Sequence, residues 1–330
     1  MARKEDDLGC SKAPQGAHGE TEAVGHVSVL LKEAIEFLAI RLGGTYIDAT
    51  LGLGGHSLEI ASRLGPQGRL IGLDKDTQAL DLARKRLFTA TAEQPHITLL
   101  HSSYAELGRL VPPASVDGIL ADLGVSSLQF GDPARGFSFQ AEGPLDMRMD
   151  PHGERTADQV VNHMREEDLA NVIYEFGEER RSRRIARAIV RARPIRTTAH
   201  LAHVISAALR SMKPERIHPA TRTFQGIRIF VNRELDDLKA LLAAAPQALK
   251  PGGRLVVISF HSLEDRIVKD ALRAGAKTDI YQVLTKKPLE ATEEEIAKNP
   301  RSRSAKLRAA VLQHPEPAKR ERDRYNRKDL

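Results

Sequence analysis

A glycine loop followed by a carboxylate is the part of this sequence best suited to binding chemistry. Residues 45–57 read Thr-Tyr-Ile-Asp-Ala-Thr-Leu-Gly-Leu-Gly-Gly-His-Ser, and residues 70–74 read Leu-Ile-Gly-Leu-Asp. Gly54 and Asp74 are separated by roughly the 20 residues that lie between a nucleotide-binding glycine turn and the acid that holds a ribose. Glycines let a ligand approach the backbone, and a helix that begins near His56 would offer free N–H groups to an anionic group. The pattern predicts a pocket for an adenosine-containing cofactor.

The type of cofactor follows from the rest of the pattern. Gly52 and Gly54 fit the dinucleotide motif G-x-G-x-x-G, but Ser57 stands where its third glycine belongs. Residues 116–122 form another apolar run that ends in an acid, and residues 249–260 place a Pro-Gly-Gly turn before a strand. This succession resembles the class I methyltransferases that use S-adenosylmethionine. That cofactor has no pyrophosphate, so the third glycine is dispensable, and the helix N-terminus would meet the methionine carboxylate.

Several further segments carry a more specific resemblance. They are His26-Val-Ser-Val-Leu-Leu-Lys-Glu33, Asp122-Leu-Gly-Val-Ser-Ser127, Arg135-Gly-Phe-Ser-Phe139, Gly143-Pro-Leu-Asp-Met-Arg-Met-Asp150, His218-Pro-Ala-Thr-Arg-Thr-Phe-Gln225, Ser259-Phe-His-Ser-Leu-Glu-Asp-Arg266 and Asn299-Pro-Arg-Ser-Arg-Ser304. Together they resemble the bacterial RsmH (MraW) family, from about His26 to about Leu312. Members of that family are N4-methyltransferases for a cytidine in the decoding region of 16S ribosomal RNA. The resemblance implies S-adenosylmethionine as methyl donor and 16S rRNA within the small ribosomal subunit as partner.

The resemblance also assigns cofactor contacts to positions that match the family's motifs. These residues are Gly54, Gly55, His56, Asp74, Tyr104, Asp122 and Gln129. Tyr104 stands where the family often has Phe, a conservative change for covering an adenine ring. Asp74 would accept hydrogen bonds from the ribose hydroxyls. His56 could equally be a helix-start residue without a ligand role.

Two residues are candidates for the chemistry of methyl transfer. The lone pair of cytosine N4 is delocalised into the ring, so an acceptor that binds an N4 hydrogen would favour the reactive geometry. Asp122 ends the fourth strand, where amino-methylating enzymes place such an acceptor, but they commonly carry Asp/Asn/Ser-Pro-Pro-aromatic there and this chain has Asp-Leu-Gly-Val. Asp122 could therefore serve mainly the cofactor. His261, at the end of the fifth strand, could accept a proton near neutral pH, although a lone histidine is more often structural.

Basic residues are concentrated where a polyanion could bind. On a helix, Arg180, Arg184, Arg187 and Arg191 would share one face, with Ile185 and Ile189 opposite. This face could bind phosphates, or it could be the solvated face of a basic helix. Three more arginines are candidate RNA contacts, although ion pairs with Asp146, Asp150 or Glu234 would look identical in sequence. They are Arg148, Arg222 and Arg228.

Strands and helices alternate in the first part of the chain, which predicts an α/β fold. We expect a Rossmann-like, doubly wound parallel sheet of class I methyltransferase type. Its strands are expected at residues 46–49, 70–73, 97–100, 116–121, 254–260, 280–284 and 306–312, the last two as an antiparallel pair. Helices are expected at residues 27–38, 57–64, 77–87, 157–164, 166–176, 179–193, 199–209 and 224–249.

The alternation stops between residues 131 and 220, where helical patterns dominate. We therefore expect an inserted all-helical, substrate-recognition domain at 131–220, with the methyltransferase domain formed by 25–130 and 221–313. Residues 1–24 are predicted to be a flexible leader and residues 314–330 a basic flexible tail. Ligands of open α/β sheets bind outside the carboxyl ends of the strands, so an insertion after the fourth strand would cover the cofactor and hold a large substrate.

Composition narrows the function class. The 330 residues are 41% hydrophobic and 28% charged, with a net charge of +6 and 4% aromatic residues. These values indicate a globular protein with a polyanionic partner and argue against single-strand binding by rows of stacking rings. The single cysteine, Cys10, and the lack of a signal or spanning segment favour a cytoplasmic protein that does not act in a membrane. No metal site is expected, and the oligomeric state stays open, a homodimer included.

Three alternatives remain at this stage. The chain could methylate another amino acceptor, such as DNA or a protein amine. It could be a non-catalytic RNA-binding assembly factor that keeps the cofactor pocket. A nicotinamide oxidoreductase is disfavoured by Ser57.

Overall fold

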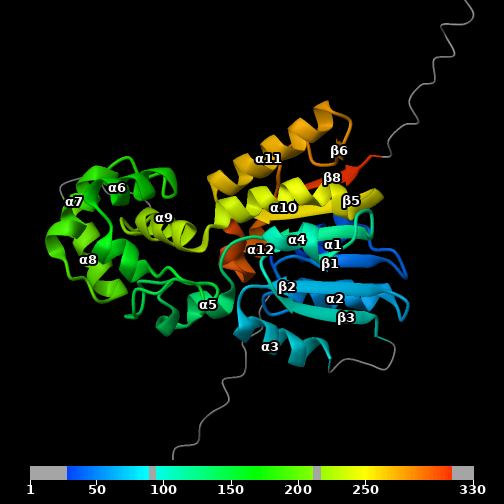
Figure 1. Ribbon diagram of the computed structural model, residues 1–330, viewed down its shortest axis with the longest axis horizontal. Helices are drawn as coiled ribbons and strands as arrows, with labels where there is room; N and C mark the ends of the chain where they lie inside the picture. The colour runs from blue at the N-terminus through cyan, green and yellow to red at the C-terminus, as the bar shows by residue number, and fades with distance from the viewer. Residues whose placement is uncertain (1–27, 89–93, 211–216, 314–330) are drawn as a thin grey trace, which may run out of the picture.

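The computed structural model describes residues 28–88, 94–210 and 217–313. Two lobes lie side by side, a sheet lobe and a helical lobe (Figure 1). The predicted leader and tail, residues 1–24 and 314–330, lie outside the described residues. None of the helices within the described residues is both long enough and apolar enough to span a membrane.

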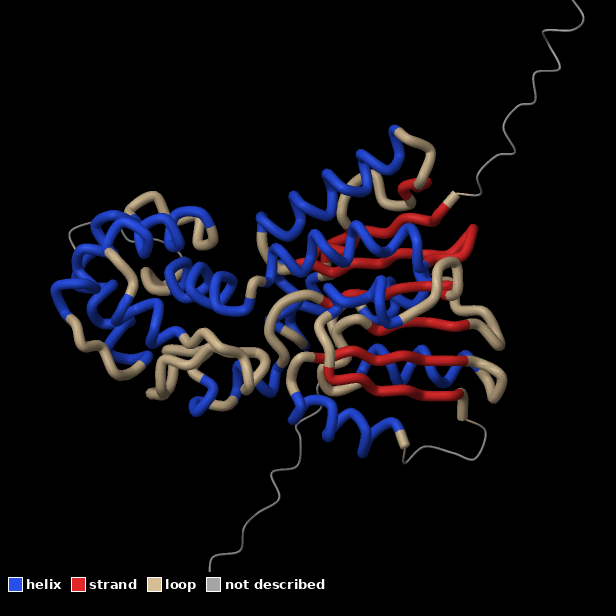
Figure 2. Tube along the Cα trace, viewed as in Figure 1, coloured by secondary structure: helices blue, strands red, loops and turns tan. Residues whose placement is uncertain are grey.

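The sheet lobe is built on eight strands. They are β1 (Thr45–Asp48), β2 (Arg69–Asp74), β3 (His96–His101), β4 (Val116–Asp122), β5 (Leu249–Ser259), β6 (Tyr281–Val283), β7 (Leu289–Glu290) and β8 (Lys306–Leu312). The main path runs β3-β2-β1-β4-β5-β8-β6, and β7 pairs with β8 off this path. The first five strands are parallel, whereas β8 is antiparallel to β5 and to β6. Figure 2 shows the strands side by side, with helices around them. The order confirms the class I methyltransferase fold and the antiparallel pair; β7 was not predicted.

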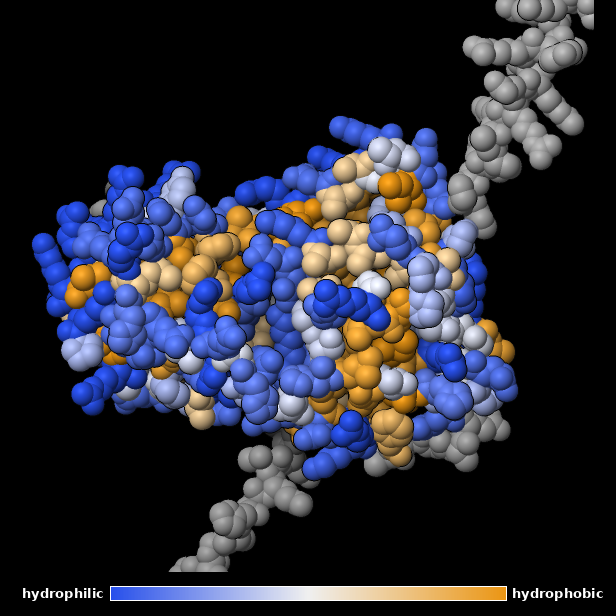
Figure 3. All heavy atoms as spheres, viewed as in Figure 1, coloured by the Kyte–Doolittle hydropathy of each residue, from blue (hydrophilic) through white to orange (hydrophobic). Residues whose placement is uncertain are grey.

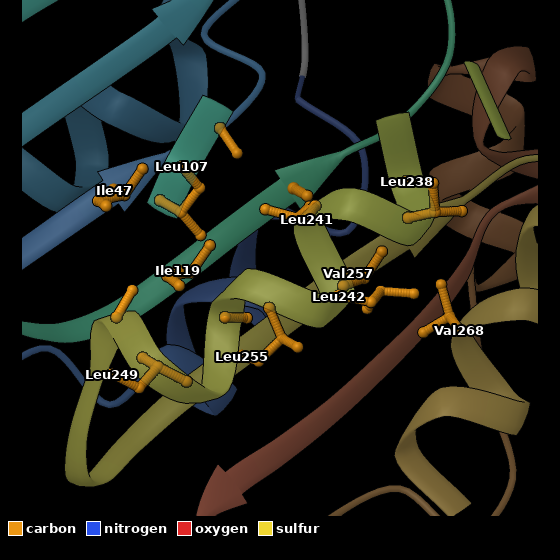
Figure 4. Close-up of a cluster of buried hydrophobic side chains, with 14 of the residues drawn as sticks. Ile47, Leu107, Ile119, Leu238, Leu241, Leu242, Leu249, Leu255, Val257 and Val268 are labelled. Carbon is orange, nitrogen blue, oxygen red and sulfur yellow. The ribbon is translucent and has the colours of Figure 1, made fainter. Parts of the chain in front are cut away.

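Helices cover both faces of this sheet. They are α1 (Leu31–Leu38), α2 (Gly55–Leu64), α3 (Thr77–Leu87), α4 (Leu107–Leu110), α10 (Glu234–Ala248), α11 (Ser262–Lys277) and α12 (Glu293–Lys298), with the 3₁₀ turns η1 (Tyr104–Glu106) and η4 (Pro300–Ser304). On one face, α10 lays Leu238, Leu241 and Leu242 onto β4 and β5 (Figure 4). On the other face, Leu30, Leu38 and Ile60 pack around the strands. Apolar side chains also reach the surface over the strands between α3 and α4 (Figure 3).

The helical lobe has its own apolar core. Its elements are α5 (Ser127–Gly131), η2 (Pro133–Arg135), the π-helical turn Gln159–His163, α6 (Glu166–Glu175), α7 (Ser182–Ala192), α8 (Thr198–Leu209) and α9 (Thr221–Asn232). The core includes Phe224, Ile227 and Val231 of α9. These residues follow each other at three- and four-residue steps, so one side of α9 faces this lobe. The apolar core of this lobe therefore extends through α9, beyond residue 220, where the sequence predicted the boundary of the insertion.

Two helix predictions were wrong at their ends. One continuous helix was expected over residues 224–249, but Arg233 adopts a left-handed conformation (φ 54°) and separates α9 from α10. The break lies where the chain passes from the core of the helical lobe to the core of the sheet lobe. A single straight helix could not pack its apolar face against both cores. The first helix begins at Leu31, because Leu30 is also left-handed (φ 49°). The predicted start at residue 27 lies outside the described residues.

The packing of α1 on the sheet gives a test of this arrangement. A Cβ at Gly118 of β4 would lie 2.8 Å from the Tyr46 ring and 2.9 Å from Cδ1 of Leu38. We expect Gly118→Ala to lower the free energy of unfolding by about 1–3 kcal/mol, the usual cost of overpacking a core. Chemical denaturation followed by circular dichroism measures this loss.

The matched control is Gly108→Ala on α4, where the new Cβ would meet Cβ of Ala244 at an ordinary 3.6 Å. Alanine also favours a helix over glycine, so this variant should be as stable as the wild type or slightly more so. Equal stability of the two variants would contradict the described contact between α1, β1 and β4.

Candidate functional site

Three acids meet at the carboxyl edge of the sheet. Asp48 and Asp74 end the paired parallel strands β1 and β2, and Asp122 ends β4, the other neighbour of β1. Parallel strands bring their carboxyl ends to one edge, so the sheet itself gathers these side chains. A cavity of about 320 Å³ opens there, with Asp74 and Asp122 in its wall. Its size is within the range of small-molecule sites.

Asp74 organises the glycine loop. One of its carboxylate oxygens accepts the Gly52 N–H at 2.7 Å and the other accepts the Asp76 N–H at 2.8 Å. Gly52 is left-handed (φ 50°), and a Cβ there would enter open space, with only the Thr50 carbonyl oxygen at 4.0 Å. The loop is thus held open beside a carboxylate that also lines the cavity.

Gly54 and Gly55 occupy different positions at the start of α2. Gly55 lines the cavity, whereas Gly54 is not among the lining residues. Gly54 is left-handed (φ 75°), and its α-carbon faces Ala83 and Leu87 of α3. It has no side chain to cap the helix, so the first N–H groups of α2 have no side-chain acceptor. The helix therefore begins at the cavity with an uncapped, partly positive end.

His56 lies deep in the wall beside Asp122. Its Nε2 donates a hydrogen bond to the Val29 carbonyl at 3.0 Å, and its Nδ1 lies 3.7 Å from Oδ2 of Asp122. Burial outweighs the Val29 hydrogen bond and lowers the pKa of His56 to about 4. His56 is therefore neutral at physiological pH and leaves the charge of Asp122 uncompensated.

The acids themselves are poised to lose their charge. Burial raises the pKa of Asp48 to about 6, despite the hydrogen bond from Ser57, and raises that of Asp74 to about 6 despite its two amide donors. Burial, with the charges of Asp48 and Glu264, raises the pKa of Asp122 well above its usual range. Oδ1 of Asp122 is buried without a hydrogen-bond partner in the part of the chain that the structure describes. Such an edge favours a cationic ligand that can offset these charges.

S-adenosylmethionine fits this set of donors and acceptors. Its sulfonium and ammonium groups carry positive charge, which matches the acids, and its carboxylate matches the uncapped start of α2. Asp74 offers acceptor oxygens for ribose hydroxyls. Tyr104 in η1, which follows β3, also lines the cavity and can cover an adenine ring. The predicted residues Gly55, His56, Asp74, Tyr104, Asp122 and Gln129 are thereby brought together in one wall.

Gln129 also has a structural role that the sequence did not reveal. Its Oε1 accepts the Ser126 N–H at 3.1 Å, which completes a capping box at α5, and its Nε2 donates to Asp76 at 2.9 Å. Arg135 donates to the same Asp76 oxygen at 2.7 Å and to the backbone carbonyls of Arg148 and Met149. This buried ion pair joins the sheet lobe to the inserted segment. The Arg-Gly-Phe-Ser-Phe motif singled out Arg135 but did not indicate its partner.

His261 lies behind the cavity rather than in its wall. Its side chain is 9% exposed, and its Nδ1 accepts the Glu264 N–H at the start of α11. Nε2 lies 3.2 Å from Glu264 Oε1 without hydrogen-bond geometry. Although burial acts to raise it, the charge and hydrogen bonding of His261 and the charge of Arg228 lower the pKa of Glu264. His261 is thus the N-cap of α11, and its neighbour Phe260 is the residue that reaches the cavity.

Glu234, His261 and Glu264 form a buried group of the type that could hold a metal ion. Both oxygens of Glu234 accept hydrogen bonds from Arg228 at 2.8 Å. Oε2 of Glu264 accepts the backbone N–H of Phe260 at 2.9 Å. Protein donors thus already use most of the ligand atoms of this group.

The isolated arginines predicted to contact RNA are bound within the protein. Arg148 forms a two-point ion pair with Asp146 and donates to the Gly153 carbonyl. Arg228 is paired with Glu234 beside the cavity, and Arg222 lies 3.7 Å from Glu179. For Arg148 and Arg228 the structure thus confirms the ion pairs with Asp146 and Glu234 that the sequence raised as an alternative.

The predicted arginine-rich helix corresponds to α7. Ile185, Ala186 and Ile189 are buried in the helical core, while Arg184, Arg187 and Arg191 face outward. Arg187 has one long contact with Glu166 at 3.4 Å. Arg180 is exposed but precedes the helix, which begins at Ser182. A basic face therefore lies on α7 and continues on the preceding turn, and its binding of phosphate stays a prediction.

Sequence reasoning missed several residues of the cavity wall. They are Ser28, Lys75, Ser102, Phe130, Met149, Asn299 and Arg301. Lys75 follows directly after Asp74, and Arg301 belongs to the Asn-Pro-Arg motif, but neither had a partner that the sequence could identify. They reach the cavity because separate strands end at the same edge.

Comparisons with known proteins agree with this geometry. The profile of the MraW methylase family matches residues 23–313. The ribosomal RNA small subunit methyltransferase H of Koribacter versatilis is 69% identical over 307 residues, which cover 91% of this chain and 98% of that relative. The protein of the same name from Acidobacterium capsulatum is 63% identical over 289 residues, with coverage of 86% and 97%. A solved rRNA methylase from Streptococcus thermophilus covers 88% of this chain and 100% of its own, with 12% identity and a TM-score of 0.39, too weak to carry any argument. The chain belongs to the MraW methylase family.

Proposed function

We propose that this protein transfers a methyl group from S-adenosylmethionine to the exocyclic N4 of a cytidine in the decoding region of 16S rRNA, within the small ribosomal subunit and in the cytoplasm. The observation that carries the proposal is the carboxylate edge beside the uncapped start of α2. The relatives' names, which specify ribosomal RNA of the small subunit, support the substrate class. The cytidine position and its N4 rest on the resemblance of the motifs.

The cofactor's role is limited and clear. S-adenosylmethionine supplies an electrophilic methyl group on a positively charged sulfur. Asp74 would bind its ribose hydroxyls, and Tyr104 would cover the adenine. Gly55 and the following amides of α2 would bind its carboxylate. Asp122 would compensate its positive charge. Among the described residues of the cavity wall, Asp122 alone has a buried side-chain oxygen without a hydrogen-bond partner.

Asp122 is the residue best placed to assist the acceptor nitrogen. It lies in the cavity wall at the end of β4, and its raised pKa makes its ionised form a stronger base than an ordinary carboxylate. Its carboxylate would accept a hydrogen bond from N4 while the N4 lone pair forms the N–CH₃ bond. Asp122 would receive the proton lost from N4, while the electron pair of the broken S–CH₃ bond would remain on the donor's sulfur. Alignment of the reacting atoms supplies much of the remaining rate enhancement.

The helical lobe would hold the RNA. It hangs over the carboxyl edge of the sheet, and α7 presents Arg184, Arg187 and Arg191 on its outer side (Figure 1). A polyanion binds such a stripe mainly through phosphate contacts, without reading the sequence. The target base must leave any helical stack to enter the cavity. Binding and chemistry would thus be divided between the two lobes.

The direct test is transfer of labelled methyl from S-adenosylmethionine to small ribosomal subunits that lack the modification. We expect incorporation at one cytidine, recovered as N4-methylcytidine after nucleoside analysis. Fully modified subunits are the control and should accept no label. Label in another nucleoside, in DNA or in protein would show that the methyl acceptor is not cytidine N4. Cofactor binding without any turnover would favour a non-catalytic assembly factor.

A second test concerns Asp74. Asp74→Asn keeps one acceptor oxygen for the loop amides but removes the charge, so we expect cofactor affinity to fall by about 1–3 kcal/mol, the value of a charge-assisted hydrogen bond. Isothermal titration calorimetry measures this loss. Asp81→Asn, on the exposed side of α3, is the matched control. Unchanged affinity in Asp74→Asn would remove Asp74 from the cofactor site.

A third test separates Asp122 from His261. Asp122→Asn should lower kcat by about 100-fold or more, as expected for loss of a general base. His261→Asn should keep kcat within about threefold, because asparagine is a good N-cap for α11. Single-turnover methylation at saturating cofactor measures both. The reverse ranking would assign the proton transfer to His261.

A further inference from the structure

A second aromatic and basic pair lies in the cavity wall. The guanidinium of Arg301 sits over the Phe130 ring, 5.3 Å from its centroid, and both residues line the cavity. Arg301 comes from η4 near the end of the chain, whereas Phe130 comes from α5 after the fourth strand. The cavity therefore has a cationic side that neither the cofactor nor the proton acceptor uses.

The local structure fixes the position of Arg301. Pro300 begins η4, and the Asn299 side chain caps it by accepting the Arg301 N–H at 3.3 Å. Ser302 is fully buried, and its hydroxyl donates to the Asn299 carbonyl at 2.8 Å. The next element, β8, pairs with β5 in the sheet. Arg301 is thus presented by a turn that is anchored on both sides.

Its charge is not compensated by a carboxylate. The other two long cations of the wall are paired, Lys75 with Asp237 at 2.5 Å and Arg228 with Glu234 at 2.8 Å. Among the described residues, no carboxylate oxygen lies within ion-pair distance of Arg301. Burial also lowers the pKa of its guanidinium. An arginine fork held in this way matches a planar or tetrahedral oxyanion.

The sheet order indicates which anion this is. Asp74 and Tyr104 follow β2 and β3, on one side of β1, and they would hold the adenosine. The start of α2, which would hold the methionine carboxylate, follows β1 at the centre. Arg301 precedes β8, beyond β4 and β5, on the opposite side. The acceptor has to approach Asp122 from the side that the adenosine leaves open.

We propose that Arg301, stacked on Phe130, binds a phosphate of the RNA strand beside the target cytidine. The proposal rests on the proposed function and adds a contact at the mouth of the same cavity. The cation–π contact with Phe130 would hold the guanidinium at the cavity, where its N–H groups could bind the phosphate. The contact would draw the strand to the cavity rather than activate the methyl group.

The experiment compares Arg301→Ala with Arg303→Ala, a matched control on the same turn, which is exposed like Arg301 but does not line the cavity. We expect Arg301→Ala to raise KM for unmodified small subunits by about tenfold or more, the loss of a charge-assisted contact, with kcat and cofactor affinity within about twofold. Filter binding at several salt concentrations should show a slope in log affinity against log salt that is smaller by about 1. Arg301→Lys should keep the salt slope but recover only part of the affinity.

Two outcomes would overturn the proposal. If Arg301→Ala weakens S-adenosylmethionine binding about tenfold and leaves KM for the subunits unchanged, Arg301 holds the methionine carboxylate instead. If it behaves like Arg303→Ala in both measurements, the pair has no ligand. If the wild-type protein binds unmodified small subunits but does not methylate them, the proposed function is contradicted instead. The two failures can be told apart because filter binding does not depend on turnover.

Discussion

The structure depends on an electrostatic constraint at the carboxyl edge of the sheet. Parallel pairing of β1 with β2 and β4 forces Asp48, Asp74 and Asp122 to the same edge, where Asp48 is buried and the other two are partly buried. Ionised carboxylates in such surroundings are costly unless a positive charge or strong donors compensate them. Backbone amides and Ser57 compensate part of this cost at Asp48 and Asp74, but one oxygen of Asp122 has no donor within the described residues. The site is therefore incomplete in a way that a sulfonium compound can complete.

Contacts between the two lobes fix the position of the helical lobe relative to this edge. Arg135 reaches from the inserted segment to the buried Asp76, next to the loop that carries Asp74. Lys75 donates to the Asn232 carbonyl at the junction of α9 and α10 and pairs with Asp237. Removing one partner of a buried ion pair costs several kcal/mol, because the other charge remains buried. The helical lobe is thus tied to the cavity at both chain crossings, so an RNA held there, as we propose, would meet the methyl donor in a fixed geometry.

The sequence predicted the parts of the fold that depend on local patterns. The glycine loop, Asp74, and the strands that end in acids were found because side-chain periodicity and turn residues are local properties. The sequence did not show that the core of the helical lobe includes Phe224, Ile227 and Val231, because the same apolar spacing suits a helix that packs on a sheet or in a bundle. The break at Arg233 was missed for a related reason, since a left-handed arginine leaves no mark in the sequence.

The candidate site was predicted unevenly for physical reasons. Residues whose role follows from strand ends, such as Asp74 and Asp122, were identified and are brought together. Residues whose role depends on which of two possible partners they meet, an acid of the protein or the RNA, were not resolved. Arg148 and Arg228 proved to be paired with Asp146 and Glu234, and His261 proved to cap a helix. Arg301 belongs to a motif that the sequence singled out, but the motif did not place it at the cavity, because that place depends on the antiparallel return of β8.

The central claim is that positive charge on the cofactor compensates the buried acids at the sheet edge. Calorimetric titration of the protein with S-adenosylmethionine near pH 6, repeated in buffers of different ionisation enthalpy, counts the protons exchanged on binding. Because the pKa values of Asp48 and Asp74 are about 6 in the free protein, a cation beside them should lower those values. We predict a net release of protons. Binding with no proton exchange, or with proton uptake, would contradict the account.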